Sequence, residues 1–311
     1  MTEVTESLGW WGLPIAILAG AIRASTPFLL VSLGECITEK SGRINLGLEG
    51  VLMMGAMAGY GASLYTGSAW LGVLAAGVVG AALGLLHGIL CSLKRVNDIA
   101  IGISFMLLGT GLAFFLGKSL IQPQAPTLSS IPFGFWSDSP QIQSALQINP
   151  LFLLGIVLAV LLHFAFLRTR WGLRIRIVGD SEDAARAMGF RVVPTRIMAT
   201  VFGGFLAGVG GSFLSLYYPG SWSEGLSSGQ GIMAVALVIF ARWEPLRCLW
   251  ASLLFGAAGA LGPAFQAMGL TSGFYLLNAL PYVLTLVILI LTTAPNRKIS
   301  GAPGELSLVR Q

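Results

Sequence analysis

The sequence predicts an all-α membrane protein, a polytopic bundle of about eight or nine transmembrane helices that includes one short or broken helix. Composition gives the first reason: only 18 basic and 13 acidic residues occur among 311, and 55% of the chain is hydrophobic. With a mean hydropathy of +0.81, the chain has too little polar surface to cover a water-soluble globule of this size. We expect residues 1–311 to form a single transmembrane domain in a lipid bilayer.

Nine apolar segments give the second reason. A bilayer core of about 30 Å needs about 20 apolar residues per helix. The segments are approximately Leu13–Gly34, Leu46–Thr66, Trp70–Leu93, Ile99–Leu116, Leu151–Leu167, Ile197–Tyr217, Gly231–Ala241, Leu249–Met268 and Phe274–Thr292. The seventh is the exception, because its eleven residues would span only about 16 Å as a helix. We expect this segment to be short, broken or re-entrant, inside the bundle.

The distribution of basic residues gives the third reason and sets the orientation. If the N-terminus lies outside and every segment crosses, 16 of the 18 Lys and Arg residues fall on one side, with Lys118 outside and Arg23 within a span. This is the asymmetry of the positive-inside rule. It places residues 168–196 in a cytoplasmic loop and residues 118–150 in an extracytoplasmic loop. The net charge of +5 then reflects orientation, and we expect no nucleic acid partner.

Glycines inside the segments favour close helix packing. Small residues at four-residue spacing let membrane helices approach each other, and we assign them no substrate role. The stripes are Gly55 and Gly59, then Gly80, Gly84 and Gly88, and then Gly204 and Gly208.

Polar residues inside spans are costly unless they are paired or face a wet cavity. Asn45 and Glu49 share one face at the inner end of the second segment. They either line a translocation pathway or tether the short Glu35–Ile44 loop through Arg43 or Lys40. Arg23 either snorkels or pairs with Glu35.

Other polar residues fall nearer to span ends. Asn97 and Asp98 open the fourth segment, where a helix cap is the commoner role. Gln266 and Asn278, the latter near Pro281, are uncharged candidates for a polar lining of the pathway.

No catalytic or metal-binding constellation is present in the sequence. The stretch Gly111–Ser119 resembles a phosphate-binding loop, but its first glycine is one position too early and the segment ends an apolar helix. The three cysteines and two histidines form no ligand motif. We therefore expect neither an enzyme nor a metal site.

The cytoplasmic loop 168–196 contains the clearest soluble feature. The sequence SEDAARAMGF, Ser181–Phe190, predicts a helix with Ser181 or Asp180 as N-cap, acids in the first turn and small residues on one side. Such a helix either presents a surface to a partner or rests on the membrane or on its own bundle.

A resemblance to a known family rests on three motifs. They are LGECITEKSGRINLGLEGVLMMGA at Leu33–Ala56, WGLRIRIVGDSEDAARAMGF at Trp171–Phe190 and GQGIMAVALVIFARWEPLR at Gly229–Arg247. In this order they resemble ABC-importer permeases of the simple-sugar, nucleoside and branched-chain amino acid group. The forms RINLGLEG and ALVIFARWEP look most like nucleoside-type permeases.

The resemblance implies several partners. Such permeases pair as two like or unlike subunits, receive substrate from an extracytoplasmic binding protein or lipoprotein, and dock cytoplasmic ABC ATPases through a coupling helix. Carried onto this chain, Glu182, Ala184, Ala185 and Gly189 match the docking pattern, although Asp183 stands where the pattern often has Ala. The chain itself would hold no cofactor, because the partner ATPase uses ATP and Mg.

The resemblance also implies a function, namely import of nucleosides across a bacterial plasma (inner) membrane. Phe105, Gln266 and Asn278 are side chains that would stack on or hydrogen-bond to a nucleoside or to a sugar such as ribose. Sugar import by the same machinery therefore stays an alternative. An ion-coupled secondary transporter is a further alternative, disfavoured because only Glu49 appears as an intramembrane acid.

Overall fold

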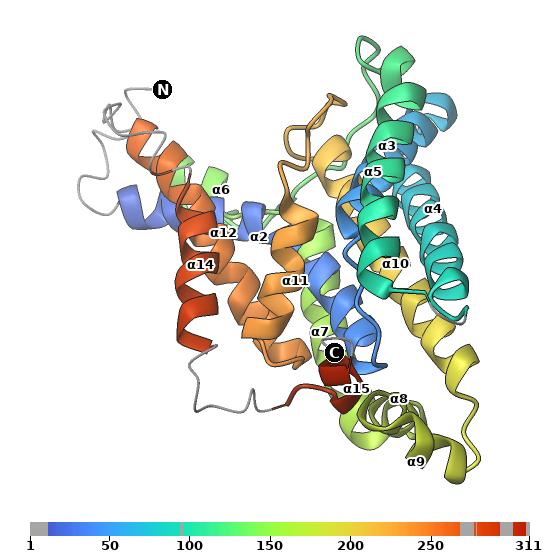
Figure 1. The fold of residues 1–311 in the computed structure, drawn as a ribbon. Helices are drawn as coiled ribbons and strands as arrows, with labels where there is room; N and C mark the ends of the chain where they lie inside the picture. The colour runs from blue at the N-terminus through green and yellow to red at the C-terminus, as the bar shows by residue number, and fades with distance from the viewer. Residues whose placement is uncertain (1–11, 94–95, 268–276, 278, 293–300, 309–311) are drawn as a thin grey trace.

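The computed structural model describes residues 12–93, 96–267, 277, 279–292 and 301–308 as a bundle of helices (Figure 1). A helix is present at each of the nine predicted segments, which confirms the predicted fold class. These helices are α2 (Gly12–Lys40), α3 (Leu48–Thr66), α4 (Ala69–Leu90), α5 (Asp98–Gly117), α7 (Pro150–Arg168), α10 (Val192–Leu216), α11 (Gln230–Phe240), α12 (Pro245–Ala267) and α14 (Leu280–Thr292).

Six of the described helices are long and apolar enough to cross a membrane: α2, α4, α5, α7, α10 and α12. Helix α3 has 19 residues and α11 has only 11. The expectation of one short helix is therefore confirmed at α11, which packs against α2, α3, α12 and α14.

The two ends of the bundle differ. One end carries α8 (Arg170–Asp180), α9 (Glu182–Ala187) and α15 (Gly304–Leu308), which is the last described helix of the chain (Figure 1). The first described residues of α2 and helix α6 (Pro140–Ala145) lie toward the other end. The basic loop 168–196 and the loop 118–150 thus lie at opposite ends, as the charge pattern requires.

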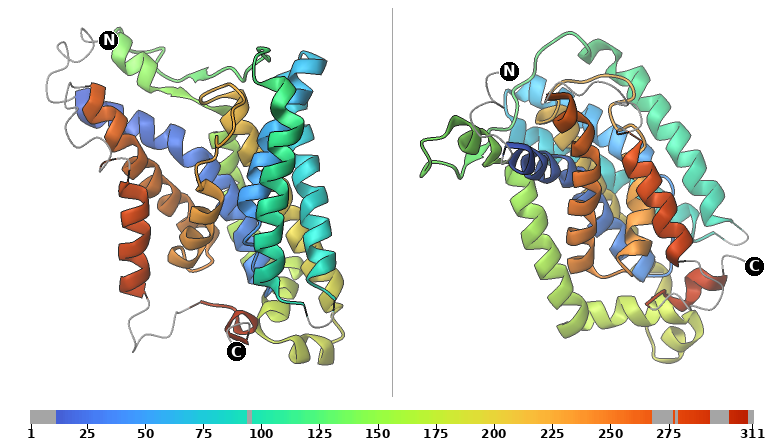
Figure 2. Two further views of the ribbon diagram at one scale, coloured as in Figure 1. Left: turned by 45° about the horizontal axis from the view of Figure 1, so that its top comes forward. Right: turned by 90° about the vertical axis from the view of Figure 1, so that its left-hand side faces the viewer.

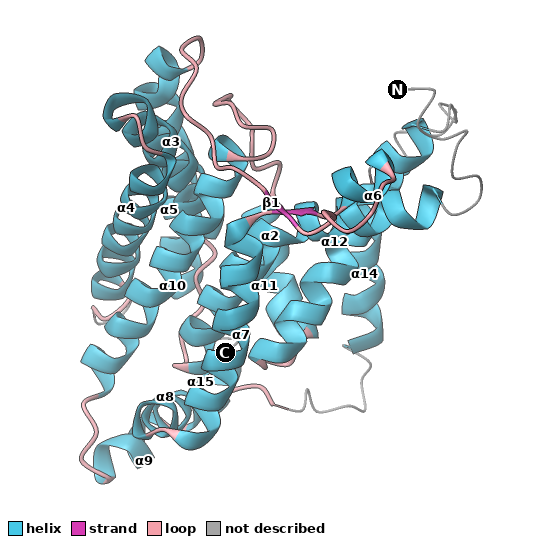
Figure 3. Cartoon of the chain, turned by 180° about the vertical axis from the view of Figure 1, so that it is seen from behind, coloured by secondary structure: helices cyan, strands magenta, loops and turns pink. Residues whose placement is uncertain are grey.

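Residues 118–150 form a small folded unit. It contains the 3-10 helix η2 (Lys118–Leu120), helix α6, and two two-residue strands, β1 (Ile131–Pro132) and β2 (Gln147–Ile148), which pair antiparallel (Figure 3). Side chains of α3 hold it, because Tyr60 Oη donates to the Pro123 carbonyl at 2.8 Å and Ser63 Oγ donates to the Pro126 carbonyl at 2.7 Å.

Helix α2 is longer than predicted. The apolar pattern predicts an end at Gly34, but the helix continues to Lys40. The added turns carry Glu35 and Glu39, both buried. Hydropathy predicts a helix end at the first carboxylate, but the helix continues, and other segments of the chain each donate a hydrogen bond to these buried carboxylates.

Helix α10 lies at the centre and packs through glycine. A Cβ on Gly208 would overlap the carbonyl oxygen of Ala76 in α4, and one on Gly204 would overlap the carbonyl of Gly80. In α3, Gly55 faces Gly208 in the same way. The predicted glycine stripes are therefore helix contacts, as small residues at such spacing usually are.

A matched pair of glycine substitutions tests this packing. Gly208→Ala is expected to destabilise the bundle strongly, because the new methyl meets a backbone oxygen that has no freedom to move. Gly111→Ala is the control, since the same methyl on α5 would meet no atom within 4 Å. Thermal unfolding of the two purified variants measures the difference. Equal melting temperatures would contradict the packing described.

Candidate functional site

The loop between α7 and α10 folds into two short helices across one end of the bundle (Figure 2). Thr169 Oγ1 caps α8 by accepting a hydrogen bond from the Gly172 amide at 3.1 Å. Ser181 Oγ caps α9 by accepting one from the Ala184 amide at 3.2 Å. The predicted N-cap at Ser181 is therefore confirmed, and this cap fixes where α9 begins.

Gly189 ends α9. Its φ is +80°, a left-handed conformation that glycine adopts without steric cost. The Phe190 amide then donates back to the Ala185 carbonyl at 2.9 Å, which satisfies a free carbonyl at the helix end. The glycine is thus explained by the local backbone turn.

A buried arginine anchors this loop to the bundle. The Arg196 side chain of α10 is only 7% exposed, and its guanidinium pairs with Glu182 at 2.8 Å and with Glu305 of α15 at 3.1 Å. The same guanidinium donates to the carbonyls of Ser41, at the end of α2, and Val178 in α8. One side chain therefore joins five segments of the chain. Its position in the sequence gives no sign of this role.

Glu182 is the acidic centre of the anchor. Hydrogen bonds from Arg186 and the nearby charge of Arg196 lower the pKa of the Glu182 carboxyl below its ordinary value of 4.5. The amide of Glu182 also donates to Glu305 Oε1 at 2.8 Å. Glu182 thus holds α9 in place.

The lowered pKa predicts how the anchor depends on pH. A carboxylate with a depressed pKa contributes stability above its unfolded pKa and loses it as the pH falls through the folded value. We expect the amides of α9 to stay protected from hydrogen exchange from neutral pH to about pH 5 and to lose protection below pH 4.5. Hydrogen-exchange mass spectrometry of wild type and Glu182→Gln tests this. Glu182→Gln should show the weaker protection at neutral pH, where wild-type Glu182 is ionised, and the two proteins should converge at low pH once Glu182 is protonated. A wild-type profile in this variant would contradict the assignment.

The other predicted coupling residues differ in exposure. Ala185 is fully buried and packs with Val178 and Val192 in a small cluster of the loop itself. Ala184 and Gly189 are exposed. The small side chain at Ala185 is therefore required by packing within the loop, whereas Ala184 lies on the outer face.

The outer face of α9 is apolar as well as exposed. Ala184 and Ala187 are exposed, and Met188 directly after the helix is 59% exposed. Asp183 and Arg186 flank these residues. A short apolar face between charges is suited to contact with another protein.

Glu49 is buried at the start of α3 and tethers α11. Its carboxylate accepts hydrogen bonds from Ser227 Oγ and from the amides of Gly229 at 2.9 Å and Gly231 at 2.7 Å. These amides lie at the N-terminus of α11, where the helix dipole favours an anion. Both oxygens of the Glu49 carboxylate therefore have hydrogen-bond partners within the described residues.

Glu49 is tethered to the residues before α11 and not, as expected, to the Glu35–Ile44 segment. Arg43 pairs with Asp98 at 2.7 Å, and the Lys40 ammonium lies 5.8 Å from the Phe166 ring centre. Within the described residues, neither cation forms an ion pair with Glu49. The partner comes from the loop before α11, which no local sequence pattern connects to α3.

Asn45 and the two glutamates of α2 form a second buried polar cluster. The backbone amide of Asn45 donates to Glu35 Oε1 at 2.8 Å, and the side-chain Oδ1 of Asn45 accepts from the backbone amide of Gly47 at 2.9 Å. Trp243 Nε1, in the bend between α11 and α12, donates to Glu39. The prediction that Glu49 is the only intramembrane acid is therefore wrong, because two acids of α2 are buried as well.

Arg23 does not pair with Glu35. Its guanidinium lies 5.1 Å from the ring centre of Tyr218, a cation–π contact. The expected pairing with Glu35 is wrong because α2 continues as a helix between the two positions. Three turns of helix hold the side chains about 18 Å apart along the axis.

Phe105 and Asn97, two other residues singled out in the sequence, make contacts within the bundle. Phe105 is buried in α5, and its ring makes an edge contact with His87 at 5.7 Å between ring centres. Asn97 caps α5 through bonds from the Ile99 and Ala100 amides, which confirms the predicted cap.

Within the described residues, the pathway candidates do not line the apolar cavity between α7 and α10. Gln266 is exposed near the end of α12, and Asn278 lies outside the described residues. Asn45, Glu49, Phe105 and Gln266 are all absent from the lining of the apolar cavity between α7 and α10. Their role in translocation stays a prediction.

Within the described residues, no group of three His, Cys, Asp or Glu side chains is placed to hold a metal ion. The described chain is an apolar helical bundle whose polar side chains hold helices together and whose basic end carries the folded loop with α8 and α9. These features define the class of a multi-pass helical membrane protein.

The chain belongs to the family described as the branched-chain amino acid transport system permease component, which it matches over residues 16–293. It is 31% identical over 310 residues to the guanosine ABC transporter permease protein NupQ of Bacillus subtilis, covering 92% of this chain and 95% of the relative. It is 30% identical over 293 residues to the nucleoside ABC transporter permease protein NupC of Lactococcus lactis, covering 88% and 91%.

A third relative is named for a sugar. It is "Putative glucose ABC transporter permease protein TsgC13" of Haloferax volcanii, 34% identical over 259 residues, covering 82% of this chain and 79% of the relative. The family and these relatives make the chain a transport component in the membrane. Such a permease works within an ABC transport system that includes ATPase and substrate-binding partners.

Proposed function

We propose that this chain is the permease subunit of an ABC importer for nucleosides in a bacterial plasma membrane. The observation that carries the proposal is similarity over nearly the whole chain to two permeases named for nucleosides. The relative named for glucose makes a simple sugar the second candidate.

The proposed substrate is tested by competition. Uptake of radiolabelled guanosine is measured in cells that express the complete importer and in cells that lack this chain. We expect excess unlabelled nucleosides to compete and excess ribose or glucose not to compete. Competition by a sugar alone would replace the nucleoside proposal with the sugar one.

The exposed face of α9 is proposed as the contact with the cytoplasmic ATPase. Ala184, Ala187 and Met188 would enter a cleft of that subunit, and the ATPase would bind the ATP and Mg. Arg196 would then pass movement of α9 to α10, which packs against α2, α3 and α4. Alternating access of the bundle to the two sides of the membrane is the proposed mechanism.

Two further partners complete the proposed importer. A second permease subunit, the same chain or a related one, would complete the membrane channel. An extracytoplasmic binding protein or lipoprotein would deliver the substrate to the end that carries the 118–150 unit.

Two substitutions of different size at one position test the α9 contact. Ala184→Arg is expected to abolish uptake and substrate-stimulated ATP hydrolysis, because a long charged side chain would block close approach to the partner. Ala184→Ser, which keeps the side chain small, should leave both near wild type. Normal uptake with Ala184→Arg would overturn the contact, since this exposed position has no role in packing.

A further inference from the structure

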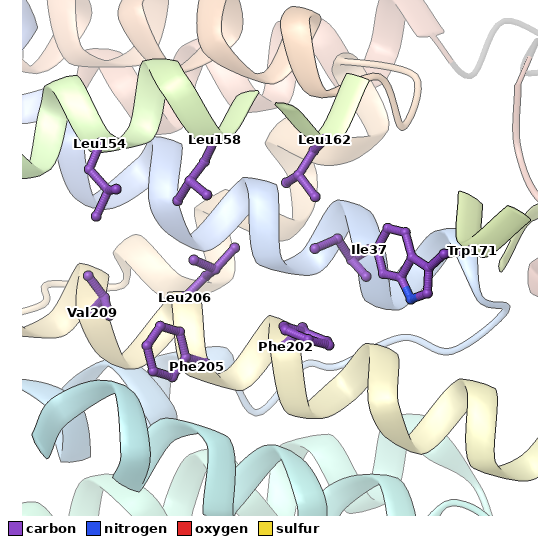
Figure 4. A pocket seen from close by; sticks show the side chains of 9 residues that line it. All are labelled: Ile37, Leu154, Leu158, Leu162, Trp171, Phe202, Phe205, Leu206 and Val209. Atoms are coloured by element: carbon purple, nitrogen blue, oxygen red, sulfur yellow. The ribbon is translucent and has the colours of Figure 1, made fainter. Parts of the chain in front are cut away.

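A cavity of about 370 Å³ lies between α7 and α10 and is lined by apolar side chains (Figure 4). One wall is formed by Leu154, Leu158 and Leu162, which recur every four residues along α7. The opposite wall includes Phe202 and Phe205 of α10. Leu154 is 41% exposed and Phe202 is 46% exposed, so the cavity is open along the side of the bundle.

The indole of Trp171 lies at one end of this groove, beside Ile37 (Figure 4). The ring stacks on Phe166 with 5.8 Å between centres and makes an edge contact with Phe202 at 6.4 Å. Trp171 belongs to the amphipathic helix α8, which runs across the basic end of the bundle (Figure 2). Tryptophan commonly occupies this boundary between hydrocarbon and headgroups.

Two arginines shortly before Trp171 in the sequence have no acidic partner among the described residues to neutralise their charge. Arg168 and Arg170 are exposed, and within the described residues neither has an acidic or hydrogen-bonding partner. Arg168 follows Leu162 by six residues on α7, a rise of about 9 Å toward the membrane surface. Positive charge thus lies at headgroup level above an apolar groove at acyl-chain level.

We propose that this groove holds an acyl chain of an anionic phospholipid whose phosphate pairs with Arg168 and Arg170. Basic pockets between transmembrane helices on the cytoplasmic side are a recognised setting for such lipids. A nucleoside or sugar does not fit the groove, because the lining offers no polar side chain to its hydroxyl groups except the Trp171 indole. The two free guanidinium groups favour an anionic lipid over an uncharged one.

Lipid binding by the purified full-length chain tests the proposal. Delipidated protein is titrated with phosphatidylglycerol and with phosphatidylcholine of the same acyl chains, and bound lipid is counted by native mass spectrometry. We expect phosphatidylglycerol to bind preferentially. Each basic side chain near the surface contributes about fivefold, so Arg168→Gln/Arg170→Gln should weaken phosphatidylglycerol binding about 30-fold and leave phosphatidylcholine unchanged. Arg191→Gln is the control, an exposed arginine distant from the groove along α10.

A second variant tests the groove itself. Leu154→Trp fills it and should weaken binding of both lipids, and this partly exposed position should tolerate the larger ring; Leu158→Trp repeats the test one turn along. Wild-type phosphatidylglycerol binding by the double arginine variant, or by both tryptophan variants, would overturn the proposal. So would a tryptophan variant that keeps its lipid but no longer co-purifies with a second permease subunit, because the groove would then seat a protein.

Discussion

Arg196→Met is expected to abolish uptake while the chain still inserts into the membrane. The guanidinium is almost fully buried and bridges Glu182 and Glu305, so its removal leaves Glu305 without its cation and leaves Glu182 with only the exposed Arg186. Breaking a buried pair typically costs about 3–5 kcal/mol. The value here should lie near or below the lower figure, since Glu182 is 32% exposed.

Hydrogen exchange and uptake together measure this effect. Amides of α9 should lose protection in Arg196→Met, and substrate should no longer stimulate ATP hydrolysis by the assembled importer. Arg186→Met is the matched control, because this arginine is 61% exposed and pairs with the same carboxylate. Such i,i+4 surface pairs contribute only about 0.3–0.5 kcal/mol. Normal uptake with Arg196→Met would show that the anchor does not transmit movement.

Glu49→Ala is expected to release the N-terminus of α11 and to inactivate the importer. The substitution leaves the Ser227 hydroxyl and the amides of Gly229 and Gly231 without their acceptor. A buried donor left unsatisfied costs about 1–3 kcal/mol, so we expect a loss of about 3 kcal/mol or more. Glu49→Gln should lie between the wild type and the alanine variant, because its amide keeps one acceptor oxygen.

Thermal unfolding and uptake of the Glu49 variants provide the measurement. Glu224→Ala is the control, since Glu224 is an exposed carboxylate in the loop before α11. If Glu49→Ala unfolds at the wild-type temperature, the tether is not stabilising. If it is destabilised but transports normally, the position of α11 is not important for transport.

The helices of this fold could be predicted from sequence because their signal is physical and local. Hydrocarbon demands long apolar segments, and the positive-inside rule orients them. The short helix α11 follows from the same comparison of segment length with bilayer thickness. The end of α2 could not be predicted in this way, because the charged Glu35 and Glu39 are typical of a loop. Only the three-dimensional arrangement shows that the Asn45 backbone amide and the Trp243 indole donate a hydrogen bond to each.

The candidate site was predictable only in part. The cap at Ser181 and the exposure of Ala184 follow from the pattern of α9, whereas Ala185 has the same side chain and faces inward. One partner of Arg196, Glu305, is 109 residues away in the chain, and one partner of Glu49, Gly229, is 180 residues away. No local periodicity identifies such pairs, so their roles required the three-dimensional arrangement.

Reconstitution into proteoliposomes tests most directly whether ATP hydrolysis by partner subunits drives this permease. The complete importer should accumulate radiolabelled nucleoside only with ATP and Mg inside the compartment that contains the ATPase, and omission of any subunit should abolish uptake. Uptake by this chain alone, driven by an ion gradient and indifferent to ATP, would contradict the assignment.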